Sequence, residues 1–163
     1  MRHALRATMM ALVLATGAAA AEPPPPPATM DNASVAAWIK TYIQTDGWTL
    51  IGADEAAVVL GDPRGVSRGA DGFLTTQIRH EYYRPTRLGD IDSRSNLQTW
   101  SVDCKQGLVR VLDMAIFEEN NLAGKSKGLS MPGAAWSATE PGSMRGRTMQ
   151  RICEAPTTGH RLN

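Results

Sequence analysis

Cysteine, histidine and aromatic residues are scarce in this chain of 163 residues. It has two cysteines and three histidines, and Phe, Trp and Tyr together make up 6% of it. Structural zinc sites use four Cys or His ligands at close spacing, which two distant cysteines do not supply. We therefore predict no metal site and no cofactor.

An excess of charge of either sign is also lacking. The chain has 17 Lys and Arg against 16 Asp and Glu, a formal net charge of +1 at pH 7. Proteins that bind nucleic acids neutralise phosphate groups with an excess of basic residues. The composition therefore predicts no nucleic-acid partner.

Long apolar runs are absent beyond the first residues. Arg2 and Arg6 precede an uncharged stretch at 9–21 that ends in small residues, which is typical of a secretory signal peptide. The alternative is a membrane anchor, but a spanning helix needs about 18 consecutive apolar residues and the strongly apolar part, 9–14, is much shorter. We predict a signal peptide at 1–21 and an exported protein, periplasmic or at the cell surface, without membrane insertion.

Composition divides the remaining chain into three parts. Residues 22–30 contain five consecutive prolines at 23–27, which favour a stiff polyproline spacer. A disordered tail or a docking motif for a proline-reading domain is the alternative. Residues 31–154 have the length of a single domain, and 155–163 form a tail predicted to be disordered.

Two segments have the periodicity of helices. In 31–46, apolar residues recur on one helical face after the potential N-cap Asp31, and Gly47 can end the helix. The second helix follows Ser143 and runs to about Cys153. We expect the first helix to pack on its own domain; a partner-binding or dimer helix is the alternative.

The segments between the helices have strand patterns. Short apolar runs occupy 48–51 and 57–60, alternating segments occupy 73–82 and 95–104, and 108–117 is apolar on both faces. A last edge strand is predicted at 135–139, and polar loops at 84–93 and 118–133. This order predicts an α+β fold with about five or six strands in an antiparallel sheet.

The two cysteines lie at the end of one predicted strand and on the last predicted helix. Cysteines of exported proteins usually pair, so we predict a Cys104–Cys153 disulfide that ties the helix to the sheet. Two buried free thiols or a metal site are the alternatives.

Catalytic motifs are absent from the sequence, and we predict a protein that is not an enzyme. Outside the predicted signal peptide the histidines are His80 and His160, and there is no Gly-x-Ser-x-Gly or His-Glu-x-x-His motif. A small hydrolase built on His80 is the disfavoured alternative. The carboxylate pairs 118–119 and 90/92 are interpreted as solvated surface, with a weak calcium site as the alternative.

Six arginine and tyrosine residues near a predicted hairpin are candidate binding residues. The strands that carry them would be neighbours, so the side chains would form a patch for an anion or a protein. Scattered surface arginines are the alternative. The residues are Arg79, Tyr82, Tyr83, Arg84, Arg87 and Arg94.

The order of motifs from Trp48 onward resembles the surface-adhesin protein E family of small exported Gram-negative proteins. An Asp-Pro turn at 62–63, a strand ending Val-Asp-Cys at 102–104, a Pro-Gly-Ser turn at 141–143 and a final helix ending in Cys153 carry the resemblance, which covers 48–154. It implies a curved antiparallel sheet with the last helix tied to its concave face by Cys104–Cys153. The helix at 31–46 and the spacer look additional.

The resemblance also implies a function. The best-known member of the family adheres to host matrix and plasma proteins and can dimerise. We therefore predict an exported, non-enzymatic protein-binding module of the adhesin type, with an unidentified protein partner and a homodimer as a further expectation. The alternative is a periplasmic envelope-accessory protein that self-associates.

Overall fold

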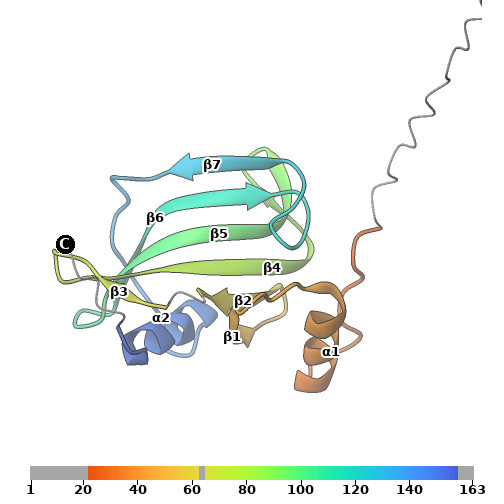
Figure 1. Cartoon of the computed structure of the whole chain (residues 1–163), viewed down its shortest axis with the longest axis horizontal. Helices are drawn as coiled ribbons and strands as arrows, with labels where there is room; N and C mark the ends of the chain where they lie inside the picture. The colour runs from red at the N-terminus through yellow and green to blue at the C-terminus, as the bar shows by residue number, and fades with distance from the viewer. Residues whose placement is uncertain (1–21, 63–64, 158–163) are drawn as a thin grey trace, which may run out of the picture.

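The computed structural model describes residues 22–62 and 65–157 (Figure 1). The predicted signal peptide, His160, the end of the predicted tail, and Pro63 and Arg64 lie outside the described residues. The elements, in chain order, are α1 Asn32–Tyr42, β1 Thr49–Ala53, β2 Ala57–Gly61, β3 Ser67–Arg68, β4 Leu74–Leu88, β5 Ile91–Asp103, β6 Leu108–Phe117, β7 Ser126–Ser130, β8 Ser137–Ala138 and α2 Met144–Glu154.

The strands form one antiparallel sheet, which confirms the predicted α+β class. Six strands follow the order β1-β2-β4-β5-β6-β7, and the two-residue strands β3 and β8 pair with β4 and β6. Figure 1 shows both helices near the edge of the sheet formed by β1 and β2, and β7 at the opposite edge. Within the described part of the chain, neither helix is long and apolar enough to cross a membrane.

The prediction of a loop at 84–93 is wrong, because β4 and β5 continue through these residues as a long hairpin. Thr86 pairs with Ser93 and Leu88 with Ile91, and Gly89 turns the chain at a φ of 63°. The pairing shifts between Glu81 and Thr86, so that 82–85 on β4 lie opposite Arg94 alone. Pro85 falls in this bulge, where a residue without an N–H is tolerated.

The prediction of a loop at 118–133 is wrong in part, because these residues include β7. This strand pairs with β6, yet all five of its residues are exposed. An edge strand that buries neither face has no alternation of apolar and polar residues, so the sequence pattern could not reveal it. The first helix also ends at Tyr42, earlier than predicted, because Ile43 is already extended.

Two apolar cores lie on opposite faces of the sheet, since neighbouring residues of a strand point to opposite sides. On the face covered by α2, Val59, Ile78 and Trp100 pack with Ile152. On the other face, Val58, Leu60 and Tyr83 pack with Trp38 of α1. We call these faces the α2 face and the α1 face.

The disulfide Cys104–Cys153 joins the end of β5 to α2, as predicted, with an S–S distance of 2.06 Å. Ser143 caps the start of α2, as predicted: its hydroxyl accepts a hydrogen bond of 3.0 Å from the N–H of Gly146. A Cβ on Gly146 would lie 2.2 Å from the carbonyl oxygen of Glu140. Close packing therefore requires glycine at this position, although glycine weakens an isolated helix.

Candidate functional site

The six candidate binding residues do not form a single patch. Tyr82 lies on the α2 face, whereas Arg79 and Tyr83 are buried on the α1 face. Alternation along β4 separates them, because adjacent residues point to opposite sides of the sheet. The remaining three lie at or beyond the bulge: Arg84 and Arg87 are exposed and Arg94 is half-buried.

Arg79 is held in a buried ion pair with Glu81. Its Nε donates to the Glu81 carboxylate at 2.6 Å, and the two residues are 3% and 0% exposed. Arg79 also donates to the carbonyl of Gln44 at 2.9 Å and to the side chain of Asn121 at 3.1 Å. Burial raises the pKa of Glu81, and the nearby Arg79 guanidinium opposes this shift. The pair therefore joins β4 to the end of α1 and faces the protein interior.

Asn120 fills the bulge between β4 and β5, a role that the sequence analysis missed. Its amide nitrogen donates to Glu81 at 2.9 Å, to the carbonyl of Tyr82 at 3.2 Å and to the carbonyl of Arg94 at 3.1 Å. The following Asn121 has a φ of 64°, a conformation that asparagine tolerates better than most residues. The adjacent asparagines were the only sequence signal for this contact.

Beyond the bulge, the end of the β4–β5 hairpin contacts β7. We call residues 84–94 the hairpin arm. Within the arm, Arg87 and Asp92 form an exposed ion pair at 3.3 Å. Asp90 at its tip pairs with Lys127 of β7 at 2.7 Å. Segments far apart in the sequence thus meet at one end of the molecule.

The free edge of β7 lies beside the hairpin arm. The N–H of Met131 donates to Leu112, and that of Glu118 donates to the carbonyl of Lys125. Because hydrogen-bonded positions alternate along an antiparallel pair, the N–H groups of Gly128 and Ser130 point away from β6. With Leu129 38% exposed, this edge offers both backbone and apolar groups to a partner.

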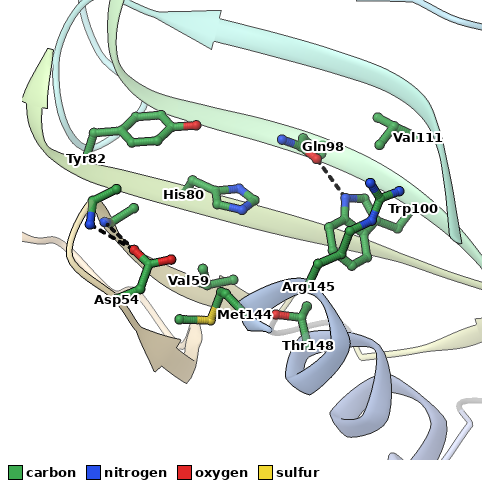
Figure 2. A pocket seen from close by; sticks show the side chains of 12 residues that line it. Asp54, Val59, His80, Tyr82, Gln98, Trp100, Val111, Met144, Arg145 and Thr148 are labelled. Carbon is green, nitrogen blue, oxygen red and sulfur yellow. Dashed lines mark hydrogen bonds between the residues drawn. The ribbon is translucent and has the colours of Figure 1, made fainter. Parts of the chain in front are cut away.

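A cavity of about 280 Å³ lies between the α2 face and helix α2, and we call it the α2 cavity. Figure 2 shows His80 and Tyr82 of β4 along one side, Trp100 and Arg145 on another, and Thr148 below. His80 bonds through Nδ1 to Asn96 at 3.0 Å, and burial lowers its pKa. Among the described residues, none of those that line the cavity is a serine.

No group of three or more His, Cys, Asp or Glu among residues 22–62 and 65–157 is placed to hold a metal ion. The polar side chains that line the α2 cavity include those of His80, Gln98, Arg145 and Thr148. Such a set suits hydrogen bonding to a ligand better than coordination of a metal.

Comparison with known proteins gives one match. A family model described as surface-adhesin protein E matches residues 48–154, from the residue before β1 to the end of α2. No curated protein and no solved structure matches the chain. Helix α1 and the proline-rich segment precede the matched region.

Proposed function

The chain belongs to the surface-adhesin protein E family, and from this premise we propose that it is an exported, non-enzymatic module that binds a protein partner. The family description supports adhesion as the general role. The disulfide-tied sheet supports the role of a binding scaffold, because binding surfaces are commonly carried on rigid elements.

We place the partner on the surface formed by the β7 edge and the hairpin arm. The exposed edge of β7 is the observation that carries this choice, since its outward N–H groups can pair with an extended segment of another protein. Arg84 and Arg87 of the arm would contact that segment from the side. In this proposal Arg79, Tyr82, Tyr83 and Arg94 support the arm rather than touch the partner.

A proline on the free edge tests the proposal. Gly128→Pro removes one outward N–H without removing a hydrogen bond to β6, so the fold is retained while pairing with a partner is blocked. Gly128→Ala is the matched control. Binding to immobilised host matrix and plasma proteins is measured by surface plasmon resonance, with thermal unfolding as the check on the fold.

We expect Gly128→Pro to lose at least about tenfold in affinity and Gly128→Ala to bind like the unmodified protein. Equal binding by both variants would show that the partner does not bind at β7. If an Arg84→Ala, Arg87→Ala double variant binds as tightly as the unmodified protein, the partner does not bind at the hairpin arm.

The same edge favours self-association as a second candidate function, because β7 of one copy can pair with β7 of another. Sedimentation velocity at increasing protein concentration separates the two. A dimer that Gly128→Pro dissociates supports the envelope-accessory alternative, whereas a monomer at high micromolar concentration contradicts it.

A further inference from the structure

The α2 cavity has the size and walls of a small-molecule site. Its apolar walls come from Val59, Trp100, Val111 and Met144 (Figure 2). Pockets for drug-sized ligands measure about 300–1,000 Å³, so a cavity of about 280 Å³ suits a smaller molecule. The cavity shares no lining residue with the β7 edge or the hairpin arm.

Hydrogen bonds along β5 fix which polar atoms of the cavity remain free. The Trp100 indole can only donate, so the oxygen of Gln98 accepts from it at 2.7 Å. The nitrogen of Gln98 then donates to Asn96 Oδ1 at 3.1 Å. The nitrogen of Asn96 in turn donates to the Tyr82 hydroxyl at 2.8 Å. The Tyr82 hydroxyl therefore keeps its own proton for another acceptor.

The same chain of bonds selects one tautomer of His80. Asn96 Oδ1 is an acceptor, so His80 Nδ1, at 3.0 Å, is the donor. In the neutral imidazole Nε2 is then a hydrogen-bond acceptor. Burial lowers the pKa of His80 and so keeps the ring neutral. His80 thus offers an acceptor to a molecule in the cavity.

Opposite charges mark the two ends of the cavity. Asp54 lies at the end near His80, and Arg145 lies at the end near Trp100 (Figure 2). One carboxylate oxygen of Asp54 accepts from the N–H groups of Ala56 and Ala57 at 2.9 and 3.0 Å. The other oxygen has no hydrogen-bond partner among the described residues and can bind a ligand. Arg145 lies in the first turn of α2, where the positive end of the helix dipole adds to its charge.

A buried hydroxyl on α2, three residues after Arg145, has no hydrogen-bond partner among the described residues. Thr148 is 1% exposed, and its Oγ1 has no partner among the described residues. Leaving a buried polar group unpaired is unfavourable, which is why most such groups are paired in folded proteins. Thr148 lines the cavity, so a bound molecule can supply the missing partner.

We propose that the α2 cavity binds a small zwitterion, a molecule with an ammonium group at one end, a carboxylate at the other and an apolar body between them. The ammonium group faces Asp54 and His80, and the carboxylate faces Arg145 and Thr148. One positive and one negative residue at opposite ends favour a zwitterion over a ligand of a single charge. Free ω-amino acids and short peptides share this chemistry.

Three matched probes test the charge requirement on the intact protein. 6-Aminohexanoate carries both charges, hexanoate lacks the ammonium group and hexylamine lacks the carboxylate. Binding is followed by NMR titration of the Thr148 methyl and the His80 ring. We expect 6-aminohexanoate to bind at least about tenfold more tightly than either of the other probes. The dipeptide Gly-Leu, measured in parallel, separates a peptide source of the ligand from a free ω-amino acid.

Variants of the two charged residues test which end of the cavity binds the ammonium group and which binds the carboxylate. Asp54→Asn keeps the oxygen that accepts from Ala56 and Ala57 but removes the charge. Arg145→Gln removes the positive side chain, and Arg147→Gln is its control, since Arg147 is exposed on the same helix and does not line the cavity. We expect Asp54→Asn and Arg145→Gln each to weaken 6-aminohexanoate at least about tenfold and Arg147→Gln to leave it unchanged.

Thr148→Val tests the unpaired hydroxyl with little change of volume. We expect this variant to melt at or above the temperature of the unmodified protein while binding 6-aminohexanoate more weakly. The proposal is overturned if all probes fail to bind at about 10 mM, if hexanoate and hexylamine bind as well as 6-aminohexanoate, or if Arg145→Gln behaves like Arg147→Gln. None of these outcomes depends on the β7 edge.

Discussion

The indole nitrogen of Trp38 donates a hydrogen bond of 2.7 Å to the backbone carbonyl of Pro25. Arg94 adds a contact of 3.3 Å to the carbonyl of Pro24. The proline-rich segment, which the sequence predicts to be a stiff spacer, therefore lies against α1 and Arg94 of β5. Polyproline segments present carbonyls in this way to aromatic donors in recognition domains.

Trp38→Phe is expected to release this segment. Phenylalanine keeps a ring against Tyr83, whose ring centroid lies 4.9 Å from that of Trp38, but removes the N–H donor. We expect the unfolding free energy to fall by about 1 kcal/mol for the hydrogen bond, with a further loss from the smaller ring. NMR relaxation of the Ala28 and Thr29 amides should show new motion on the ps–ns timescale. Unchanged relaxation at both amides would mean that the Trp38–Pro25 bond does not hold the segment.

Asn120→Asp is expected to be among the most damaging single substitutions. It places a second carboxylate beside the buried Glu81 and directs acceptors at the carbonyls of Tyr82 and Arg94. An unpaired buried charge costs about 3–5 kcal/mol, and urea unfolding should show a loss of that size. Glu118→Gln, at an exposed neighbouring position, is the control and should stay within about 0.5 kcal/mol of the unmodified protein. A small loss for Asn120→Asp would contradict the role given to Asn120.

Cys153→Ser is expected to destabilise the fold and to loosen α2 first. The disulfide closes a loop with a sequence separation of 49, for which the loss of chain entropy in the unfolded state amounts to roughly 4 kcal/mol. Hydrogen exchange should accelerate in α2 more than in β4 and β5, because α2 then depends on packing alone. Reductant should lower the stability of the unmodified protein to a similar level and leave the variant unaffected. A variant as stable as the oxidised protein would refute the prediction.

Acidification is expected to destabilise the protein through His80. Burial lowers the pKa of His80 in the folded state below its ordinary value of 6.5. As the pH falls, the unfolded chain therefore binds the proton first, and the unfolding free energy decreases below about pH 6.5. The slope from one group is at most about 1.4 kcal/mol per pH unit.

Urea unfolding of the unmodified protein and of His80→Gln between about pH 5 and pH 8 checks this expectation. The amide of glutamine can still bond to Asn96 but does not titrate, so the variant should lose part of the pH dependence. Identical slopes for the two proteins would show that His80 does not contribute.

The strands and the disulfide could be predicted because burial on one face leaves a direct mark on the sequence. Leu74 and Ile78 recur on one face of 73–82, and Trp100 and Val102 recur on one face of 95–104. The pairing of the two cysteines follows from the exported context. The α2 face carries most of this signal. Its core residues Ile78, Trp100 and Val102 fall at the predicted positions.

The α1 face could not be predicted in the same way. The sequence pattern predicts that Arg79 and Glu81 face solvent, because charged residues at alternate positions are typical of an exposed strand face. Their burial depends on Asn120, Asn121 and the end of α1, which lie far away in the sequence. Pattern rules describe one segment at a time and contain no information about such contacts. The cavity depends in the same way on residues from β2, β4, β5 and α2.

The Arg79–Gln44 and Asn121–Tyr42 contacts reach from the family-matched region into the segment that precedes it. We therefore expect the smallest part of the chain that folds by itself to be larger than the family region. A fragment that begins at Trp48 would expose Val58, Leu60 and Tyr83 to water and leave an arginine and a carboxylate without their cover. For this chain, the natural place to trim an expression fragment lies ahead of the proline-rich segment, and the helix that follows it must be kept.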